Sequence, residues 1–347
     1  MHIFLLGDFE SDNGPGNANK KTRDSLLLKY EIKYSKEKGW IKRIYEMYKG
    51  ITQADILLIC SASKINYLAI RIAKYQKKKI LYLMHGYASF EKKIENPKLT
   101  DRELKKTYEY EEYIFTNVDR IICVSKRFMY YMKTERPKYA YKFDYIFNII
   151  DVEKIEKIYR NSQGSKKKNQ ILSVGGGMRR KNILTLANAL GESDKGVKLI
   201  VVGKSLYDGE RIRSFDNVVW YEHLKHEELY RTMAETALYI QNSIFETFGL
   251  AVVEALYAGC SILVSDSVGC LDLFKNLTDQ DVIFDTYDQK EIQEKAEYLL
   301  LNPNNQRLMQ GLKKECFSKE WHANRWTDII VGVNEKPNPP AMLGRME

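Results

Sequence analysis

Short apolar runs that alternate with helix-like segments constrain the fold of this 347-residue chain most. Each run is mainly apolar, and the segments between runs show apolar residues at helical spacing. A strand that is apolar on both faces belongs in a parallel sheet covered by helices on both sides. The predicted strands are residues 2–6, 55–60, 79–84, 120–126 and 145–151, and then 170–174, 198–203, 218–221, 237–240, 261–265 and 281–284.

The same pattern occurs twice, which predicts an α/β chain of two Rossmann-like, doubly wound parallel-sheet domains. We expect an N-terminal domain over 1–150, a linker over 151–168 and a C-terminal domain over 169–333. The last helix of the C-terminal domain is able to pack back on the N-terminal domain. Residues 334–347 hold three of the seven prolines and are expected to form a mobile tail.

Several classes of protein are not expected from the composition. No run approaches the roughly 18 apolar residues that cross a bilayer, and the N-terminus lacks the features of a signal peptide. The five cysteines include no CxxC pair, which argues against zinc and disulfides and favours a reducing cytoplasm. His223 and His226 have no third ligand at a suitable spacing, so no metal is expected.

Positive charge is concentrated in the first part of the chain. Residues 1–150 carry 29 Lys and Arg against 18 Asp and Glu, a net charge of +11, whereas the remainder carries −2. This excess favours an acidic partner such as a membrane surface, a lipid-linked phosphate or nucleic acid, or it is only a solvated lysine-rich surface. A helical region expected from residue 17 to about 48, with a break at Gly39, mixes lysines with aromatic residues. It could make a peripheral contact with anionic lipid or pack its apolar stripe on the sheet.

Residues 241–256 form the strongest candidate site. Glu246 precedes a helix that starts near Gly249, and Glu254 lies eight residues later, inside that helix. The free N–H groups and the positive dipole end at a helix start favour a phosphate. Two carboxylates that flank this helix start suit the hydroxyls of a polyol. The pattern therefore predicts a ligand with the shape of a sugar nucleotide.

A glycine run and three cations open the second half. Residues 175–177 are all glycine and permit close backbone approach at the end of a strand. The consecutive cations Arg179, Arg180 and Lys181 can then meet a diphosphate.

Two further candidates lie in the first half. Gly14 and Gly16 surround Pro15 and predict a tight, exposed loop before a helix that begins near Asn17; the loop is either ligand-facing or a plain turn. His85 follows the strand at 79–84, at the edge where parallel sheets bind ligands. We therefore predict that His85 contacts the sugar or handles a proton.

Taken in order, these motifs resemble family 4 of the retaining glycosyltransferases, which have the two-domain GT-B fold. The resemblance spans nearly the whole chain, and its most specific part is the E-x7-E signature in the sequence E-T-F-G-L followed by a helical E-A-L. The features that carry it are Gly14 and Gly16, His85, the Phe147-Asn148-Ile149-Ile150-Asp151 domain exit, Arg180-Lys181, and Glu246 and Glu254 with Thr247-Phe248-Gly249.

The resemblance implies two domains that face a central cleft, and roles for the site residues. Glu246 would contact the donor sugar, Glu254 the ribose hydroxyls, and His85 would lie over the sugar. Arg180 and Lys181 would neutralise the leaving nucleoside diphosphate in place of a metal, although the compressed run leaves open whether Arg179 or Arg180 takes the arginine position. The implied donor-binding residues are Gly14, Gly16, Gly176, Thr247, Phe248, Gly249, Leu250 and Glu254.

The expected activity is a retaining, metal-independent hexosyl transfer that needs no cofactor. The donor would be a UDP, GDP or dTDP sugar, and the acceptor a growing, lipid-linked glycan of the capsule, exopolysaccharide or lipopolysaccharide type. The expected location is the cytoplasm, at the inner membrane face. The alternatives are a nucleotide-sugar epimerase of GT-B fold and a non-catalytic nucleotide-sugar-binding protein. Nucleic acid is not an expected partner, because the chain shows no DNA- or RNA-binding motif.

Overall fold

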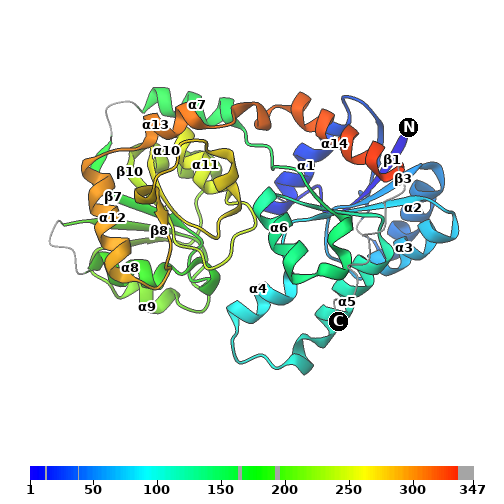
Figure 1. The fold of residues 1–347 in the computed structure, drawn as a ribbon, viewed down its shortest axis with the longest axis horizontal. Helices are drawn as coiled ribbons and strands as arrows, with labels where there is room; N and C mark the ends of the chain where they lie inside the picture. The colour runs from blue at the N-terminus through cyan, green and yellow to red at the C-terminus, as the bar shows by residue number, and fades with distance from the viewer. Residues whose placement is uncertain (12–13, 38, 163–165, 192–195, 335–347) are drawn as a thin grey trace, which may run out of the picture. The chain divides into compact units, whose positions relative to one another are not determined.

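A computed structural model describes residues 1–11, 14–37, 39–162, 166–191 and 196–334 (Figure 1). The chain forms two compact units. The first comprises Met1–Tyr87, Asp101–Ile149 and the chain from Glu315 onward, and the second comprises Ala88–Thr100 and Ile150–Lys314. The expected tail, 334–347, lies outside the described residues except for its first residue, and so do residues 163–165 of the expected linker.

The first unit contains a six-stranded parallel sheet in the order β2-β1-β3-β4-β5-β6. The strand order reverses beside β1, so the carboxyl ends of β1 and β3 lie at a switch point of a doubly wound sheet. The strands are β1 (His2–Leu6), β2 (Glu31–Tyr34), β3 (Ile56–Ile59), β4 (Lys79–Met84), β5 (Arg120–Cys123) and β6 (Phe143–Tyr145).

Helices cover both faces of this sheet. α2 packs with α3 and on β1, and α1 packs with the C-terminal helix α14. The helices of this unit are α1 (Gly14–Leu26), α2 (Trp40–Gln53), α3 (Ile65–Tyr75), α5 (Asp101–Asn117), α6 (Lys126–Glu135) and α14 (Lys319–Asn334). None of the helices in the described part of the chain is both long and apolar enough to cross a bilayer.

The structure corrects two expectations for the first 50 residues. α1 begins at Gly14, so Gly14 and Gly16 lie in its first turn and not in a loop ahead of it. Pro15 explains this start, because its fixed φ suits the first turn and its missing N–H is not needed there. The helical region expected from 17 to about 48 does break at Gly39, which caps α2, but its first part is also interrupted by β2, an edge strand that pairs with β1.

The second unit contains a six-stranded parallel sheet in the order β12-β11-β10-β7-β8-β9. The chain builds one half outward from β7 and the other outward from β10, so the switch point lies between these two strands. The strands are β7 (Lys167–Val174), β8 (Lys198–Val202), β9 (Val218–Tyr221), β10 (Thr236–Gln241), β11 (Ser261–Ser265) and β12 (Val282–Ile283).

Helices again cover both faces, which confirms the predicted fold class. α8 packs with α12, whereas α7 packs with α10 and α11. Buried Leu, Ile and Val side chains of β7, β8, β10 and β11 form a core with α8 and α12. The helices are α4 (Ala88–Glu95), α7 (Val152–Asn161), α8 (Ile183–Gly191), α9 (Gly209–Arg213), α10 (His226–Glu235), α11 (Leu250–Tyr257), α12 (Gln289–Leu301) and α13 (Asn305–Gly311).

Candidate active site

The glycine run after β7 packs backbone against backbone. A Cβ on Gly176 would lie 2.3 Å from the carbonyl oxygen of Lys204, and a Cβ on Gly177 would lie 1.6 Å from that of Ser205. Gly176 also has a φ of +58°, which favours glycine. These glycines therefore hold the end of β7 against the loop after β8, and a donor contact of Gly176 stays a prediction.

Gly175 makes room for the side chain of Lys181. A Cβ on Gly175 would lie 2.5 Å from Lys181 Cγ, and its φ of +146° again favours glycine. The 3₁₀ turn η2 (Arg179–Lys181) follows and ends on Asn182, which has a left-handed conformation. This path carries the Lys181 ammonium to the carboxylate of Glu246. The sequence did not suggest a separate role for Gly175. The feature that could have indicated one is its position directly after β7.

Glu246 lies beside two cations and an amide. Its Oε2 contacts Lys181 Nζ, lies 3.8 Å from Arg180 Nη1 and accepts a 3.2 Å hydrogen bond from Gln241 Nε2. Burial raises the pKa of Glu246, but the charges of Lys181 and Arg180 outweigh this effect and hold the pKa below its usual value. Glu246 is therefore a carboxylate at neutral pH, at the carboxyl ends of the two switch-point strands.

Neighbouring loops fix the turn that carries Glu246. The Ser243 carbonyl oxygen accepts hydrogen bonds from the hydroxyls of Ser265 and Ser267, at 2.6 and 2.5 Å. The main-chain oxygen of Glu246 accepts from the N–H of Gly269, and that of Phe248 from the N–H of Cys270. Because the main chain is held at several points, the turn presents Glu246 in one position. Thr247 and Phe248 are buried in this turn.

Gly249 is the N-cap residue directly before α11, and Glu254 lies within that helix. Gly249 has a φ of +92°, and a Cβ there would lie 2.6 Å from Val268 Cγ1, so the turn into the helix requires glycine. Leu250 is the first residue of α11. Glu254 accepts a 3.2 Å hydrogen bond from Tyr230 of α10, a partner that sequence reasoning missed.

Glu246 and Glu254 both raise the pKa of the buried Tyr239 hydroxyl. Burial raises the pKa of Tyr239 well above its usual value, and the charges of Glu246 and Glu254 raise it further. Tyr239 lies on β10 and donates to Gln241 Oε1 at 2.7 Å, while Gln241 Nε2 donates to Glu246. Both predicted carboxylates therefore lie close enough to Tyr239 to raise its pKa.

The geometry distinguishes the two arginines of η2. Arg180 approaches Glu246, whereas Arg179 stacks its guanidinium on Tyr207, 5.0 Å from the ring centre, and lies 3.9 Å from Asp208. Of the two arginines, Arg180 therefore lies beside Glu246, and which of them contacts a diphosphate stays a prediction.

Helix α4 contacts both arginines, which sequence reasoning did not anticipate. Glu95 Oε2 accepts the backbone N–H of Arg179 at 2.9 Å, and Glu95 Oε1 lies 3.4 Å from Arg180 Nε. Glu91 lies 4.0 Å from the same nitrogen. The rings of Phe90 and Phe245 meet edge to face at 5.0 Å. Arg180 is thus shared among three carboxylates.

In the first unit, His85 belongs to a partly buried polar group at the carboxyl ends of the strands. His85 Nε2 lies 2.8 Å from Asn19 Oδ1, and Asn19 Nδ2 donates to the main-chain oxygens of Asp8 and Cys60. Burial lowers the pKa of His85 to about 4, so the imidazole is neutral at pH 7. Asn19 was missed in the sequence, since a single Asn in a helix carries no distinctive pattern.

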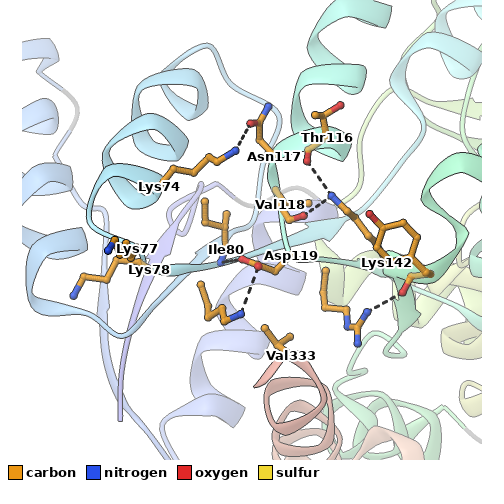
Figure 2. A pocket seen from close by; sticks show the side chains of 13 residues that line it. Lys74, Lys77, Lys78, Ile80, Thr116, Asn117, Val118, Asp119, Lys142 and Val333 are labelled. Atoms are coloured by element: carbon orange, nitrogen blue, oxygen red, sulfur yellow. Dashed lines mark hydrogen bonds and ion pairs between the residues drawn. The ribbon is translucent and has the colours of Figure 1, made fainter. Parts of the chain in front are cut away.

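At the other ends of the strands, where β4 and β5 begin, lies a cation-lined cavity of about 500 Å³ (Figure 2). Lys142 Nζ donates to the main-chain oxygens of Phe115, Thr116 and Val118, and Arg120 donates to that of Tyr141. Lys142 thus satisfies carbonyls where α5 ends, and cations are favourable at helix C-termini. Arg120 satisfies a carbonyl in the 3₁₀ turn Pro137–Lys142. Part of the positive charge of the first half therefore serves the fold.

The described residues include no group of three or more His, Cys, Asp or Glu side chains that could hold a metal ion. In the second unit, the cations Arg180 and Lys181, the carboxylate of Glu246 and the N-terminus of α11 lie at one switch point. Such a set can bind an anionic group beside a polar one and can stabilise charge that develops on a leaving group.

Comparisons with known proteins agree with this geometry. Residues 155–314 match the family model described as glycosyl transferases group 1. A curated relative is an uncharacterized 41.2 kDa protein in the cps region of Klebsiella pneumoniae, 23% identical over 286 residues, which are 72% of this chain and 80% of the relative.

Two solved structures superpose on almost the whole chain. One is HepE of Anabaena in complex with UDP and glucose, with a TM-score of 0.66, 14% identity, and coverage of 96% of this chain and 100% of the other. The other is sucrose-phosphate synthase of Thermosynechococcus elongatus, with a TM-score of 0.67, 14% identity and coverage of 96% and 97%. The chain thus has the GT-B glycosyltransferase fold, and most of its second unit matches the group 1 glycosyl transferases.

Proposed function

We propose that the protein transfers a sugar from a nucleotide sugar to a glycan acceptor, with retention of the anomeric configuration. The observation that carries the proposal is the cluster of Lys181, Arg180 and Glu246 at the switch point between β7 and β10. Ligands of open parallel sheets bind at such points. The match of residues 155–314 to group 1 glycosyl transferases supports the same activity.

The two cations suit the leaving group of this reaction. When the bond between the sugar and the diphosphate breaks, negative charge develops on the diphosphate. Lys181 and Arg180 can neutralise that charge, and the N-terminus of α11 adds free N–H groups and a positive dipole end. Fixed cations supply the stabilisation that a metal ion gives in other transferases, so we propose a reaction that needs neither metal nor cofactor.

In this proposal, Glu246 and Glu254 contact different parts of the donor. Glu246 stays ionised and can orient the sugar hydroxyls or stabilise positive charge on the ring. Glu254, inside α11 and bonded to Tyr230, would accept hydrogen bonds from the ribose. His85, neutral at pH 7, would contact the sugar as a hydrogen-bonding group.

The comparisons suggest the class of donor and acceptor. HepE was solved with UDP and glucose, which supports a UDP sugar over GDP and dTDP sugars as the donor. The cps region named for the Klebsiella protein supports a surface-polysaccharide acceptor, which we propose to be lipid-linked. All five cysteines are free and buried, which fits a reducing cytoplasm.

The test measures donor hydrolysis and transfer with Lys181→Ala and Glu246→Gln variants. Loss of one charge-stabilising group from such a site costs about 100-fold or more in rate. Lys167→Ala and Glu235→Gln are matched controls, because these residues form a 2.7 Å ion pair on the exposed surface of the same unit. A rate in the K181A and E246Q proteins equal to that of the controls contradicts the proposal, and an inverted anomeric centre in the product's NMR spectrum contradicts retention.

The same assay separates the alternatives. A nucleotide-sugar epimerase forms its product from the donor alone, without an acceptor. A non-catalytic binding protein binds nucleotide sugars, seen as a raised melting temperature, but turns none over. A thermal-shift series with UDP, GDP, ADP and dTDP and their sugars identifies the base.

A further inference from the structure

One apolar stripe of α2 packs against the sheet of the first unit. Met47 and Ile51 are buried, and Ile44 beside them is partly buried. Gly50 lets the helix lie close to the sheet, because a Cβ there would lie 2.4 Å from the ring of Phe4 on β1. This stripe is the one that packs on the sheet.

A second apolar stripe on the same helix is largely exposed. Ile41, Tyr45 and Tyr48 follow one another at helical spacing and are 82%, 65% and 53% exposed. Trp40, at the start of α2, is 66% exposed. Single exposed apolar residues are common, but four large ones on a 14-residue helix form a patch that calls for a partner.

Positive charge borders this stripe. Lys42 and Lys49 are exposed and lie one helical repeat apart beside it. The acidic residue of α2, Glu46, accepts the backbone N–H groups of Lys36 and Glu37. At the other end of the helix, Lys78 Nζ donates to the Thr52 carbonyl oxygen, so the lysines at the cavity of Figure 2 adjoin the last turn of α2. The partner should therefore be apolar and negatively charged.

We propose that α2 lies flat on an anionic lipid surface. Trp40, Ile41, Tyr45 and Tyr48 would enter the interfacial region, where Trp and Tyr keep their polar atoms wet, and the lysines would meet lipid phosphates. At 14 residues the helix is shorter than the roughly 20 that cross a bilayer, so it binds at the surface. This proposal fits a lipid-linked acceptor but does not rest on the transfer reaction, because lipid binding is measured without donor or acceptor.

The test is co-sedimentation of the full chain with phosphatidylglycerol-containing vesicles and with pure phosphatidylcholine vesicles. The variant Ile41→Ser/Tyr45→Ser removes two members of the stripe and should weaken partition at least about tenfold. Tyr298→Ser/Leu301→Ser is the matched control, because these residues are 46% and 72% exposed on α12 of the second unit. All variants should keep the far-UV circular dichroism and melting temperature of the parent.

Charge is tested separately. Lys42→Gln and Lys49→Gln should each weaken binding to the anionic vesicles about fivefold, and added salt should do the same. Equal binding by I41S/Y45S and the control, or equal binding to both vesicle types, overturns the proposal. A dimer in sedimentation without lipid that the I41S/Y45S change dissociates also overturns it, since the stripe would then be a contact between copies of this chain.

Discussion

The missing side chain of Gly175 leaves the space that the side chain of Lys181 occupies. The glycine lacks a side chain where the lysine stem crosses the end of β7, and the ammonium then reaches Glu246. Catalytic sites depend on supporting residues of this kind, because a small displacement of a charged group weakens its effect on the reaction.

Gly175→Ala should therefore displace Lys181 and weaken donor binding. The added Cβ meets Lys181 Cγ, and alanine is strained at a φ of +146°, so we expect a loss of about 1–3 kcal/mol of stability as well. Calorimetric titration with UDP and thermal unfolding measure the two effects. Gly332→Ala is the control: nothing lies within 4 Å of its Cβ position in α14, and alanine favours a helix. Unchanged UDP binding in the G175A protein would show that Lys181 does not depend on this space.

Lys181 also sets the charge of Glu246. In Lys181→Met only Arg180 remains as a cation near the carboxylate, so burial should raise the pKa of Glu246. The acid limb of the pH–kcat/KM profile should then move to higher pH, because Glu246 takes up its proton earlier as the pH falls. An acid limb that stays in place in K181M means that Glu246 does not control activity. Glu235→Gln, in the exposed ion pair, should leave the profile unchanged.

At the scale of elements, short amphipathic segments were the hardest to predict. β2 is four residues long and pairs with β1 alone, so its alternation of Glu31, Ile32, Lys33 and Tyr34 was read as part of a helix. Most buried strands were found nearly in full, because continuous apolar runs have few other places in a fold. The strand expected over 145–151 is wrong: β6 ends at Tyr145, and Ile146, Phe147, Ile149 and Ile150 are buried outside any strand. α4 was missed because its packing depends on residues that are distant in the sequence.

The contacts of α4 lead to a prediction about donor binding. Glu91 and Glu95 compete with any diphosphate for Arg180, so Glu91→Gln/Glu95→Gln should lower the Kd for UDP two- to tenfold, roughly the range of one weakened ion pair. Glu156→Gln is the control, because Glu156 pairs with Arg160 on the exposed face of α7. Weaker binding by the double variant would show instead that the two carboxylates position the arginines.

At the scale of the whole molecule, the sequence predicted the fold class and the main part of the candidate site in the second unit. The E-x7-E stretch, the cations and the helix start are contiguous motifs, so their chemistry can be read locally. Asn19, Tyr230 and the α4 contacts could not be predicted, because each depends on which elements become neighbours after folding. The two units also differ in the burial of their histidines, which only the structure shows.

Two histidines of the first unit, the partly buried His85 and the buried His322, make it sensitive to acid. Burial lowers the pKa of His85 and of His322 to about 4. His322 on α14 contacts Ser25 of α1 and the Phe147 carbonyl oxygen. Because each folded pKa lies below the unfolded value of 6.5, the unfolded chain takes up protons first. The stabilisation is complete above about pH 6.5 and is lost as the pH falls toward 4.

His322→Gln tests this linkage. Between pH 7 and pH 5 the histidine should cost the parent about 2 kcal/mol of unfolding free energy, a range in which most carboxylates stay ionised. H322Q should be less stable at pH 7, since it loses a fitted side chain, but its stability should fall less over this interval. Urea unfolding at several pH values gives both quantities, and His226→Gln, on α10 of the second unit, is the control. An equal fall in the parent and H322Q proteins would mean that His322 is protonated without unfolding, and that the α1–α14 contact tolerates the charge.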